Sequence, residues 1–465
     1  MAPPDSKPAP DALYTARIPI FPRRVKGTFR TLKWWIMGVT LAIYYLTPWI
    51  RWDRGPLMPD QAVLVDLANR RFFFFWIEIW PQQFIYVAGL LIMAGLGLFL
   101  FTSALGRVWC GYTCPQTVWT SIFMWIEQKT EGSRNQRIKL DKAPWSAEKA
   151  ARKGAKHAGW FFVAFMTGMT FVGYFYPIRE LVWELATFST GKWQALWTVF
   201  FTLATYVNAG WMREQVCKFM CPYARFQSVM FDRDTLIVSY DPNRGEPRGS
   251  RKRDADRGAL GLGDCVDCDL CVQVCPTGID IRDGLQYECI GCALCIDACD
   301  SIMDKMGYPR GLIRYTSENE LEGGTTHWLR PRVIGYVTML IVMIAVFSYN
   351  VASRIPLEMT VIRDRNQLFV ETADGAIENI YKLHLVNMDG NPHTFTLTID
   401  GIEGAELLGR SRYDLEGGEV QTISLRVRAR PETLTAPSTE MTFTAVAEDM
   451  PSLRAVAESR FMRPL

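Results

Sequence analysis

The sequence predicts a multi-domain protein with an α-helical membrane domain of five spans, a small inserted α+β domain rich in cysteine, and a C-terminal all-β sandwich. Three observations predict this fold class. Five long stretches carry no charge, eight of the twelve cysteines fall in two tight runs, and polar and apolar residues alternate after about residue 357. The chain has 465 residues, 49% of them hydrophobic and 21% charged, with a mean hydropathy of +0.02. This composition suits a membrane part joined to polar domains and excludes a disordered chain.

The uncharged stretches predict the membrane spans. They cover residues 34–50, 79–106, 158–178, 193–212 and 333–353. A spanning helix needs roughly 20 mostly apolar residues, and five such stretches exceed what the core of a soluble protein supplies. A sixth uncharged stretch, residues 108–126, contains many polar residues. We expect it to be a re-entrant or interfacial segment.

The distribution of lysine and arginine predicts the orientation. These residues gather in the first 33 residues, in the loop at 107–157 and in the segment after residue 212. Cytoplasmic loops carry an excess of lysine and arginine. We therefore expect these regions in the cytoplasm and the C-terminal region on the outer side, with the lipid bilayer as a partner. The net charge of +3 does not point to nucleic acid.

Eight cysteines form two runs with the spacing C-x2-C-x2-C-x3-C. Pro276 follows the first run, whereas Asp300 follows the second, where the usual pattern has proline. The spacing is that of a two-cluster bacterial ferredoxin, in which the fourth cysteine of each run ligates the other cluster. The expected [4Fe-4S] ligands are Cys265, Cys268, Cys271 and Cys299 for one cluster, and Cys289, Cys292, Cys295 and Cys275 for the other. C-x2-C pairs also make zinc sites, but two complete runs favour iron–sulfur clusters and a ferredoxin-like domain.

The remaining four cysteines form two C-x3-C-P motifs. They are Cys110 and Cys114, before Pro115, and Cys217 and Cys221, before Pro222. Each motif follows an even-numbered span, so the membrane domain reads as an internal duplication. We expect the four thiols to share one catalytic or metal-binding site near the cytoplasmic surface. Buried cysteines can serve simply as small apolar residues, but two matching copies favour a function. Thiolates select copper(I), zinc or iron–sulfur centres, so a copper site, a redox dithiol and a third cluster all stay open.

The C-terminal region predicts short alternating strands. We expect them at residues 360–364, 381–387, 395–399, 421–427 and 441–446. Strands of this kind, separated by turn signals, are typical of a β-sandwich. The region contains no cysteine, and we expect a docking module rather than an enzyme. We expect His384 and His393 to be structural or surface residues.

These observations divide the chain into five parts. They are a basic cytoplasmic arm (1–33), a four-span membrane domain with both C-x3-C-P motifs (34–243), a two-cluster ferredoxin domain (244–332), a fifth span (333–353) and an outer β-sandwich (354–465).

In this order of parts the chain resembles the cytochrome c oxidase accessory protein family CcoG, also called FixG or RdxA. The resemblance covers nearly the whole chain. The ferredoxin spacing is shared by many proteins, whereas the order of parts is far more specific. The resemblance implies a polyferredoxin of the bacterial inner membrane whose C-terminal sandwich is Ig-like and periplasmic. It further implies a role in assembling the cbb3-type cytochrome c oxidase and a cupric reductase activity that converts copper(II) to copper(I).

The cofactors expected are two [4Fe-4S] clusters, with copper as a further candidate. The partners expected are copper ions, copper chaperones or assembly factors of the cbb3-type oxidase, a cytoplasmic electron donor and, in a homo-oligomer, a second copy of the chain. Two other functions stay open. One is a quinone-linked transmembrane electron conduit to a periplasmic partner, and the other is a non-enzymatic assembly scaffold.

Overall fold

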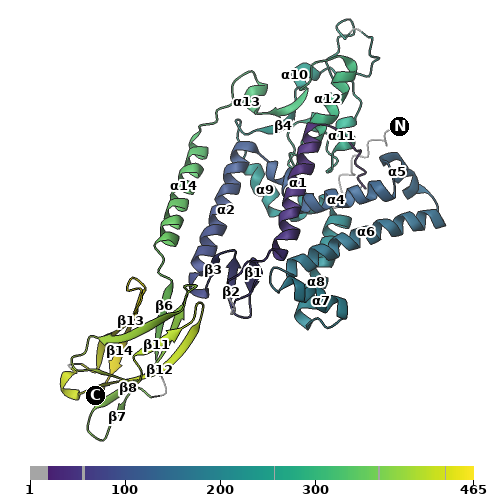
Figure 1. The fold of residues 1–465 in the computed structure, drawn as a ribbon. Coiled ribbons are helices and arrows are strands. Elements are labelled where there is room, and N and C mark those ends of the chain that lie inside the picture. The colour runs from purple at the N-terminus through teal and green to yellow at the C-terminus, as the bar shows by residue number, and fades with distance from the viewer. Residues whose placement is uncertain (1–18, 55–57, 256, 365–366, 435, 465) are drawn as a thin grey trace, which may run out of the picture. The chain divides into compact units, whose positions relative to one another are not determined.

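The computed structural model describes residues 19–54, 58–255, 257–364, 367–434 and 436–464, and Figure 1 shows the elements in chain order. The first 18 residues of the predicted basic arm lie outside the described residues. The chain forms two compact units. The first comprises Met1–Ile50, Val63–Arg70 and Pro81–Ile344, and the second comprises Arg51–Ala62, Arg71–Trp80 and Ala345–Leu465.

A helix corresponds to each of the five predicted spans. These are α1 (Thr28–Leu46), α2 (Phe84–Leu105), α6 (Ala147–Val172), α8 (Lys192–Thr205) and α14 (Pro331–Ala352). Within the described ranges, two of them, α2 and α14, are long and apolar enough to cross a membrane. The first turns of α1 and α6 carry basic residues, and α8 passes into a π-helix at Tyr206–Met212. The count of five spans therefore stays a prediction.

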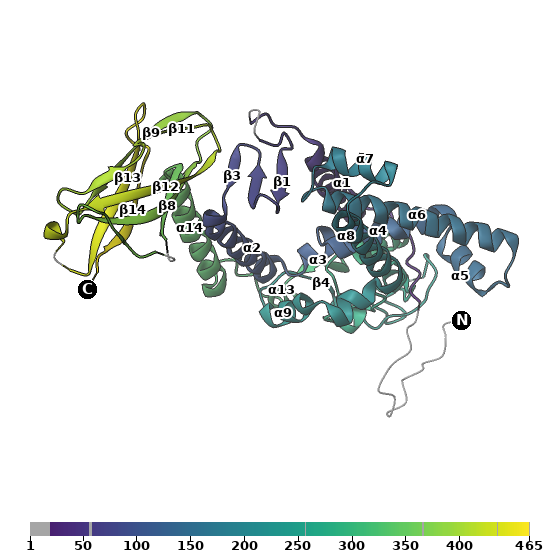
Figure 2. The same cartoon turned by 90° about the horizontal axis from the view of Figure 1, so that it is seen from below.

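The uncharged stretch at 108–126 forms two helices. They are α3 (Val108–Tyr112) and α4 (Pro115–Thr130). Helix α4 packs on α6, and α6 packs on α8, so these three lie side by side, as Figure 2 shows. Within this group Phe123 stacks on Trp160 with 5.3 Å between ring centroids. The remaining helices of the first unit are α5 (Arg134–Lys142), α7 (Ile178–Thr187), α9 (Pro222–Met230), α10 (Pro242–Gly245) and α13 (Glu318–Leu321).

The region with the two ferredoxin runs is a small α+β fold. Strand β4 (Ile237–Tyr240) pairs antiparallel with β5 (Ile313–Thr316). Two helices lie between them in the chain, α11 (Leu270–Val274) and α12 (Leu294–Met306). Val238, Ile296 and Leu312 share one buried core. Strand β4 precedes residue 244, so the pairing closes the fold with residues upstream of the predicted start.

The N-terminus of α1 is anchored on this α+β fold. The backbone N–H groups of Phe29 and Arg30 donate to the Asp297 carboxylate of α12, at 3.1 Å and 2.7 Å. A carboxylate stabilises a helix N-terminus because the first N–H groups have no partner within the helix. A Cβ at Gly27 would come within 2.2 Å of the Asp297 Cγ atom, so only glycine fits there. The same junction buries Lys33, at 2% exposure.

The second unit contains a β-sandwich of two antiparallel sheets. One sheet has the order β10-β12-β8-β6, with β7 also paired to β8, and the other has the order β11-β9-β13-β14. The strands are β6 (Leu357–Arg363), β7 (Val370–Glu371), β8 (Ile377–Asn387), β9 (His393–Asp400), β10 (Glu406–Leu408), β11 (Arg412–Leu415), β12 (Val420–Ala429), β13 (Ser438–Ala447) and β14 (Arg454–Met462). Outside the sandwich lie β1 (Val63–Asp66), of the first unit, and the hairpin β2–β3 (Arg71–Phe74, Ile77–Ile79).

All five predicted strands are present, as parts of β6, β8, β9, β12 and β13. No strand was predicted after residues 441–446, and this is wrong. Strand β14 follows and pairs with β13 along nine residues of the register, from Ser438↔Met462 to Val446↔Arg454. The alternation of polar and apolar residues along β14 is weak because a small residue, Ala455, lies on the buried face of the strand together with Phe461. The core between the sheets is formed by Tyr381, Phe395 and Phe443, each with 0% exposure.

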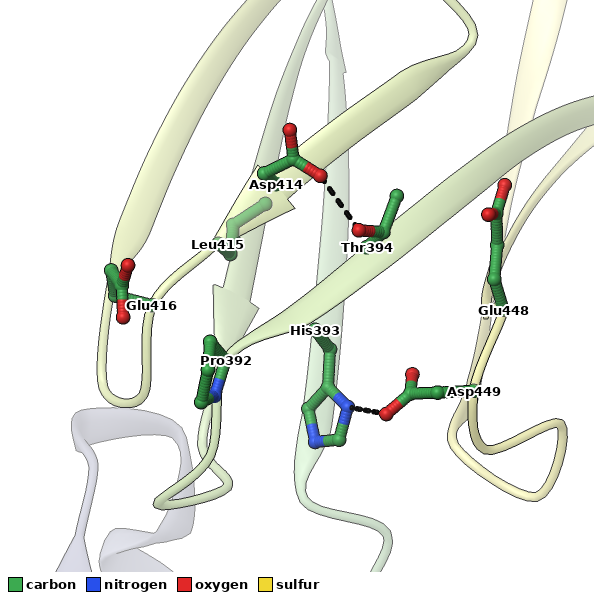
Figure 3. A pocket seen from close by; sticks show the side chains of 8 residues that line it. All are labelled: Pro392, His393, Thr394, Asp414, Leu415, Glu416, Glu448 and Asp449. Atoms are coloured by element: carbon green, nitrogen blue, oxygen red, sulfur yellow. Dashed lines mark hydrogen bonds and ion pairs between the residues drawn. The ribbon is translucent and has the colours of Figure 1, made fainter.

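A buried histidine joins three segments of the sandwich. The ring of His393, at the start of β9, contacts two carboxylates: Nδ1 lies 2.7 Å from Asp449, and Nε2 lies 2.8 Å from Asp389. Figure 3 shows the contact with Asp449 beside a cavity whose acidic residues include Asp414. Burial alone would lower the pKa of His393, but the hydrogen bonds and charges of the two carboxylates outweigh burial and raise it.

This histidine predicts a pH-dependent stability. A folded-state pKa above the unfolded value stabilises the fold fully below about pH 6.5, and the stabilisation is lost as pH rises through the folded-state pKa. We expect the melting temperature of the sandwich to fall by roughly several °C between pH 6 and pH 9, and His393→Gln to remove this dependence. Differential scanning calorimetry measures both. His384→Gln is the matched control because His384 contacts only the Thr422 hydroxyl among the contacts described; an equal effect of both variants would contradict the assignment.

Candidate functional site

The structure brings together the first predicted ligand group. Cys265, Cys268, Cys271 and Cys299 line one small cavity, although Cys299 comes from the other run. Cys268 is exposed, whereas Cys265 and Cys271 are buried. Burial raises the pKa of Cys271 and of Cys299 to about 12. Ligation requires thiolates, so loading this site with iron would release protons.

The second predicted group also gathers. Burial raises the pKa of Cys289 to about 12, and the nearby Cys292 and Cys275 raise it further. Cys295, which is half-buried, has a pKa raised well above its ordinary value, first by burial and then by Cys292, Cys289 and Cys275. The N–H of Gly291 donates to the Cys289 sulfur at 3.5 Å. Hydrogen bonds of this kind tune the reduction potential of a cluster when one is bound.

The two cysteine runs share an unusual backbone conformation at equivalent positions. The second and fourth residues after the first cysteine have positive φ: Asp267 (51°) and Asp269 (54°) in one run, Gly291 (64°) and Ala293 (58°) in the other. Non-glycine residues seldom adopt this conformation. Alternating conformations of this kind turn successive N–H groups inward and form anion-binding concavities, which occur at iron–sulfur sites. The donor set and the backbone therefore fit a pair of [4Fe-4S] clusters.

One buried arginine holds the first run in this shape. Arg282 contacts Asp267, Asp269 and Asp280, at 2.7, 2.7 and 2.6 Å, and its side chain is 6% exposed. It also lines the cavity of the first cysteine group. Arg282 was not among the residues predicted from the sequence. The signal that could have revealed it was the pair of aspartates within the first run, Asp267 and Asp269.

The two C-x3-C-P motifs have matching local structures. Cys114 caps α4, and Cys221 caps α9, with the following proline as the first helical residue in each case. Proline suits this position because the first N–H of a helix has no partner within the helix. The first cysteine of each motif lies in a short preceding segment, Cys110 in α3 and Cys217 in a π-helical turn at Val216–Met220. The duplication read from the sequence is thus present in the local backbone.

The four motif cysteines come together. Burial raises the pKa of Cys110 to about 12, with further contributions from Cys114 and Cys217. Burial likewise raises the pKa of Cys217 to about 11, with contributions from Cys114 and Cys221. In the part of the chain that the structure describes, however, no three His, Cys, Asp or Glu side chains are arranged to hold a single metal ion. A cubane holds its four thiolates on four different irons, so its ligands lie farther apart than those of one ion.

The four-thiol group adjoins the second ferredoxin group. A Cβ at Gly111 would come within 2.9 Å of both the Cys292 Cα and the Ile290 carbonyl oxygen, so α3 packs directly on that loop. Cys110 packs against the core cluster that contains Cys292. A small cavity is lined both by Cys217 and by Thr277, near Cys275. The two groups of thiols therefore form one continuous region.

Arg107 lies at this junction. Its guanidinium donates to the carbonyl oxygens of Cys289, at 3.2 Å, and of Tyr287 and Ala224. It interacts electrostatically with Cys110, Cys289, Cys217 and Cys221. Arg107 is 6% exposed. In the sequence, Arg107 was read only as one of the basic residues of a loop. Together, Arg107 and Arg282 place a buried arginine beside each ferredoxin group, and these positive charges offset the negative charge of thiolate ligands.

Three family profiles match the chain. A 4Fe-4S binding domain matches residues 87–131, a 4Fe-4S dicluster domain matches 212–318, and the Ig-like fold at the C-terminus of FixG matches 347–464. The first match contains Cys110 and Cys114, and the second contains the other ten cysteines.

Curated relatives match most of the chain. Nitrogen fixation protein FixG of Rhizobium meliloti is 44% identical over 427 residues, covering 85% of this chain and 82% of that protein. Protein RdxA of Cereibacter sphaeroides is 48% identical over 405 residues, covering 85% of each. Among solved structures, a FixG-related protein from Vibrio parahaemolyticus is 30% identical, with a TM-score of 0.22, covering 24% of this chain and 98% of that one.

Proposed function

We propose that this chain, which belongs to the FixG and RdxA family, passes electrons through its ferredoxin region to the four motif thiols. Copper(II) is reduced to copper(I) at these thiols. The family and its 4Fe-4S profiles make the chain an iron–sulfur electron-transfer protein, and its two long apolar helices suggest a membrane protein. The observation that supports the finer proposal is the packing of α3, with Cys110, directly on the Ile290–Cys292 loop.

The proposed ligands are those expected from the spacing. Cys265, Cys268, Cys271 and Cys299 would hold one cluster, and Cys275, Cys289, Cys292 and Cys295 the other. When bound, each cluster supplies one electron at a time. Arg282 and Arg107 offset the negative charge of the two ligand groups, and the buried apolar residues around them exclude water. The positive charges favour the reduced state, which is the more negative one, whereas the exclusion of water opposes it because a buried negative charge loses its solvation.

The four motif thiols are the proposed copper site. Copper(II) takes one electron from the protein and becomes copper(I), and a reductant in the cytoplasm returns that electron. Cys114 and Cys221 sit at the N-termini of α4 and α9. Burial raises the pKa of Cys114, so copper binding there would release a proton. Thiolates retain the soft copper(I) ion. Cys110 and Cys217, in the preceding segments, are the further thiols of the proposed site; since no three of the described side chains are already arranged around one ion, copper would have to draw the thiols together.

The family resemblance supplies the cellular context of the proposal. The product copper(I) would be delivered to the cbb3-type oxidase during assembly, through copper chaperones or assembly factors. The protein would lie in the bacterial inner membrane with the ferredoxin region in the cytoplasm. The Ig-like sandwich would lie in the periplasm as a docking module.

A second candidate role for the motif cysteines is a third [4Fe-4S] cluster. The match of a 4Fe-4S binding domain to residues 87–131 favours it, because that segment contains Cys110 and Cys114 and none of the other ten cysteines. Four cysteines satisfy such a cluster. The chain would then be an electron conduit with three centres, and copper would not bind at the motifs.

Stopped-flow mixing tests the proposed reduction. Protein purified without oxygen is reduced with dithionite, desalted and mixed with copper(II) in the presence of a copper(I)-specific chromophore. We expect the cluster absorbance to return to its oxidised value as about two copper(I) ions form per protein, one per cluster. Zinc(II) is the control, since it accepts no electron. Clusters that stay reduced after mixing would contradict the proposal.

A further inference from the structure

An open cavity of about 710 Å³ lies in the first unit, away from the four motif thiols. Its walls come from the chain at Arg23 and Arg24, from the turn that joins α4 to α5, and from α11. Arg134 and Arg137 add two more guanidinium groups. The other lining residues are glutamine, serine, asparagine and glycine, and none of the lining residues is acidic.

The positive charge of this cavity is largely uncompensated. Arg137 is paired with Glu127, at 3.0 Å. No ion pair joins Arg23, Arg24 or Arg134 to a carboxylate of the residues that the structure describes. Arg137 is only 1% exposed, and its Nε atom has no hydrogen-bond partner among the described residues. A buried donor without a partner is costly, so the described residues leave this guanidinium incompletely satisfied.

Hydrogen bonds hold the walls in place. The N–H of Arg23 donates to the Gln273 carbonyl at 2.7 Å, which ties the N-terminal segment to α11. Arg134 donates to the Phe21 carbonyl at 3.0 Å, and Arg137 donates to the Pro22 carbonyl at 2.6 Å. The cavity is therefore preformed.

We infer that this cavity binds the phosphate group of an anion, carried either by a soluble phosphate compound or by an anionic phospholipid headgroup. Guanidinium groups match phosphate oxygens in geometry and charge, and the volume lies in the range of small-molecule sites. The occupant would lie beside Gln273, two residues before Cys275. This inference does not depend on the proposed copper chemistry.

Calorimetric titration of the full-length protein with inorganic pyrophosphate tests the soluble source. Arg23 and Arg24 are exposed, so Arg23→Gln with Arg24→Gln leaves the packed core intact. We expect saturable binding by the unsubstituted protein and at least about tenfold weaker binding by this double variant. Lys139→Gln with Lys142→Gln removes the same charge from α5 outside the cavity and should bind as the unsubstituted protein does.

Native mass spectrometry tests the lipid source. The protein and both double variants are extracted from membranes that contain phosphatidylglycerol. We expect the unsubstituted protein and the lysine control to retain this lipid and the arginine variant to lose it. That result would identify a headgroup site. The inference is overturned if neither arm shows binding, or if the two double variants lose binding equally, because the effect would then reflect net charge alone.

Discussion

Replacing Cys110, Cys114, Cys217 and Cys221 together by serine is expected to abolish copper(II) reduction while the iron content stays unchanged. The eight proposed cluster ligands lie elsewhere, so the clusters should still form and accept electrons. The variant should be reduced by dithionite as before but fail to pass electrons to copper(II), because no soft donor remains. Iron analysis measures the iron content, and the stopped-flow assay measures the reduction of copper(II).

The same variant separates the two roles proposed for the motif cysteines. A loss of about four irons per protein would show a third cluster and contradict the copper site. Unchanged copper(II) reduction with unchanged iron would contradict both roles. The control is Thr113→Ser with Thr120→Ser, which alters hydroxyl residues of the same segment without removing a thiol. It should reduce copper(II) at the rate of the unsubstituted protein.

Replacing single ferredoxin cysteines by alanine is expected to remove one cluster at a time. Cys268→Ala should lose about four irons, and the exposed position of Cys268 should leave the second cluster in place. Cys295→Ala should also lose about four irons and should unfold the region more extensively, because Cys295 lies on α12 and packs against the core cluster that contains Cys292. Metal ligation is coupled to folding in small domains. Iron analysis, low-temperature EPR and calorimetry measure these changes.

Asp267→Asn is the matched control for these variants. Asp267 adjoins Cys268 and has a φ of 51°, a conformation that asparagine also tolerates. The variant should keep both clusters, although it weakens the contact with Arg282. Zinc in place of iron after anaerobic purification would contradict the cluster assignment, as would a full complement of iron in Cys268→Ala.

The sequence predicted the elements whose signal is local. The spacing of the cysteine runs predicted two groups of four in which the runs exchange a ligand, and the structure places Cys299 with the first run. The two C-x3-C-P motifs predicted an internal duplication, and α4 and α9 both begin at the proline of their motif. Strand β14 was missed because small residues on its buried face weaken the period of two.

Residues whose role depends on long-range contacts could not be predicted from the sequence. In the sequence, Arg30 and Lys33 were read as charges that orient a membrane helix. In the structure, the backbone N–H of Arg30 donates to the carboxylate of Asp297, 267 residues away. Arg107 likewise read as a loop charge, yet it bridges backbone carbonyls of Tyr287 and Ala224. The prediction of membrane orientation counts a basic residue in the same way whether its side chain faces water or a buried carbonyl group.

The sequence by itself determined the family resemblance, the two cysteine runs, the duplicated motif and the alternating strands. These are signals of spacing and period, which a single segment carries whatever surrounds it. Only the tertiary structure decided that the motif cysteines lie against the second ferredoxin group, that each run has its own buried arginine, and that the arginines around α5 surround one cavity. These features arise where distant segments pack, and packing depends on the shape and burial of surfaces that the linear order of residues does not display.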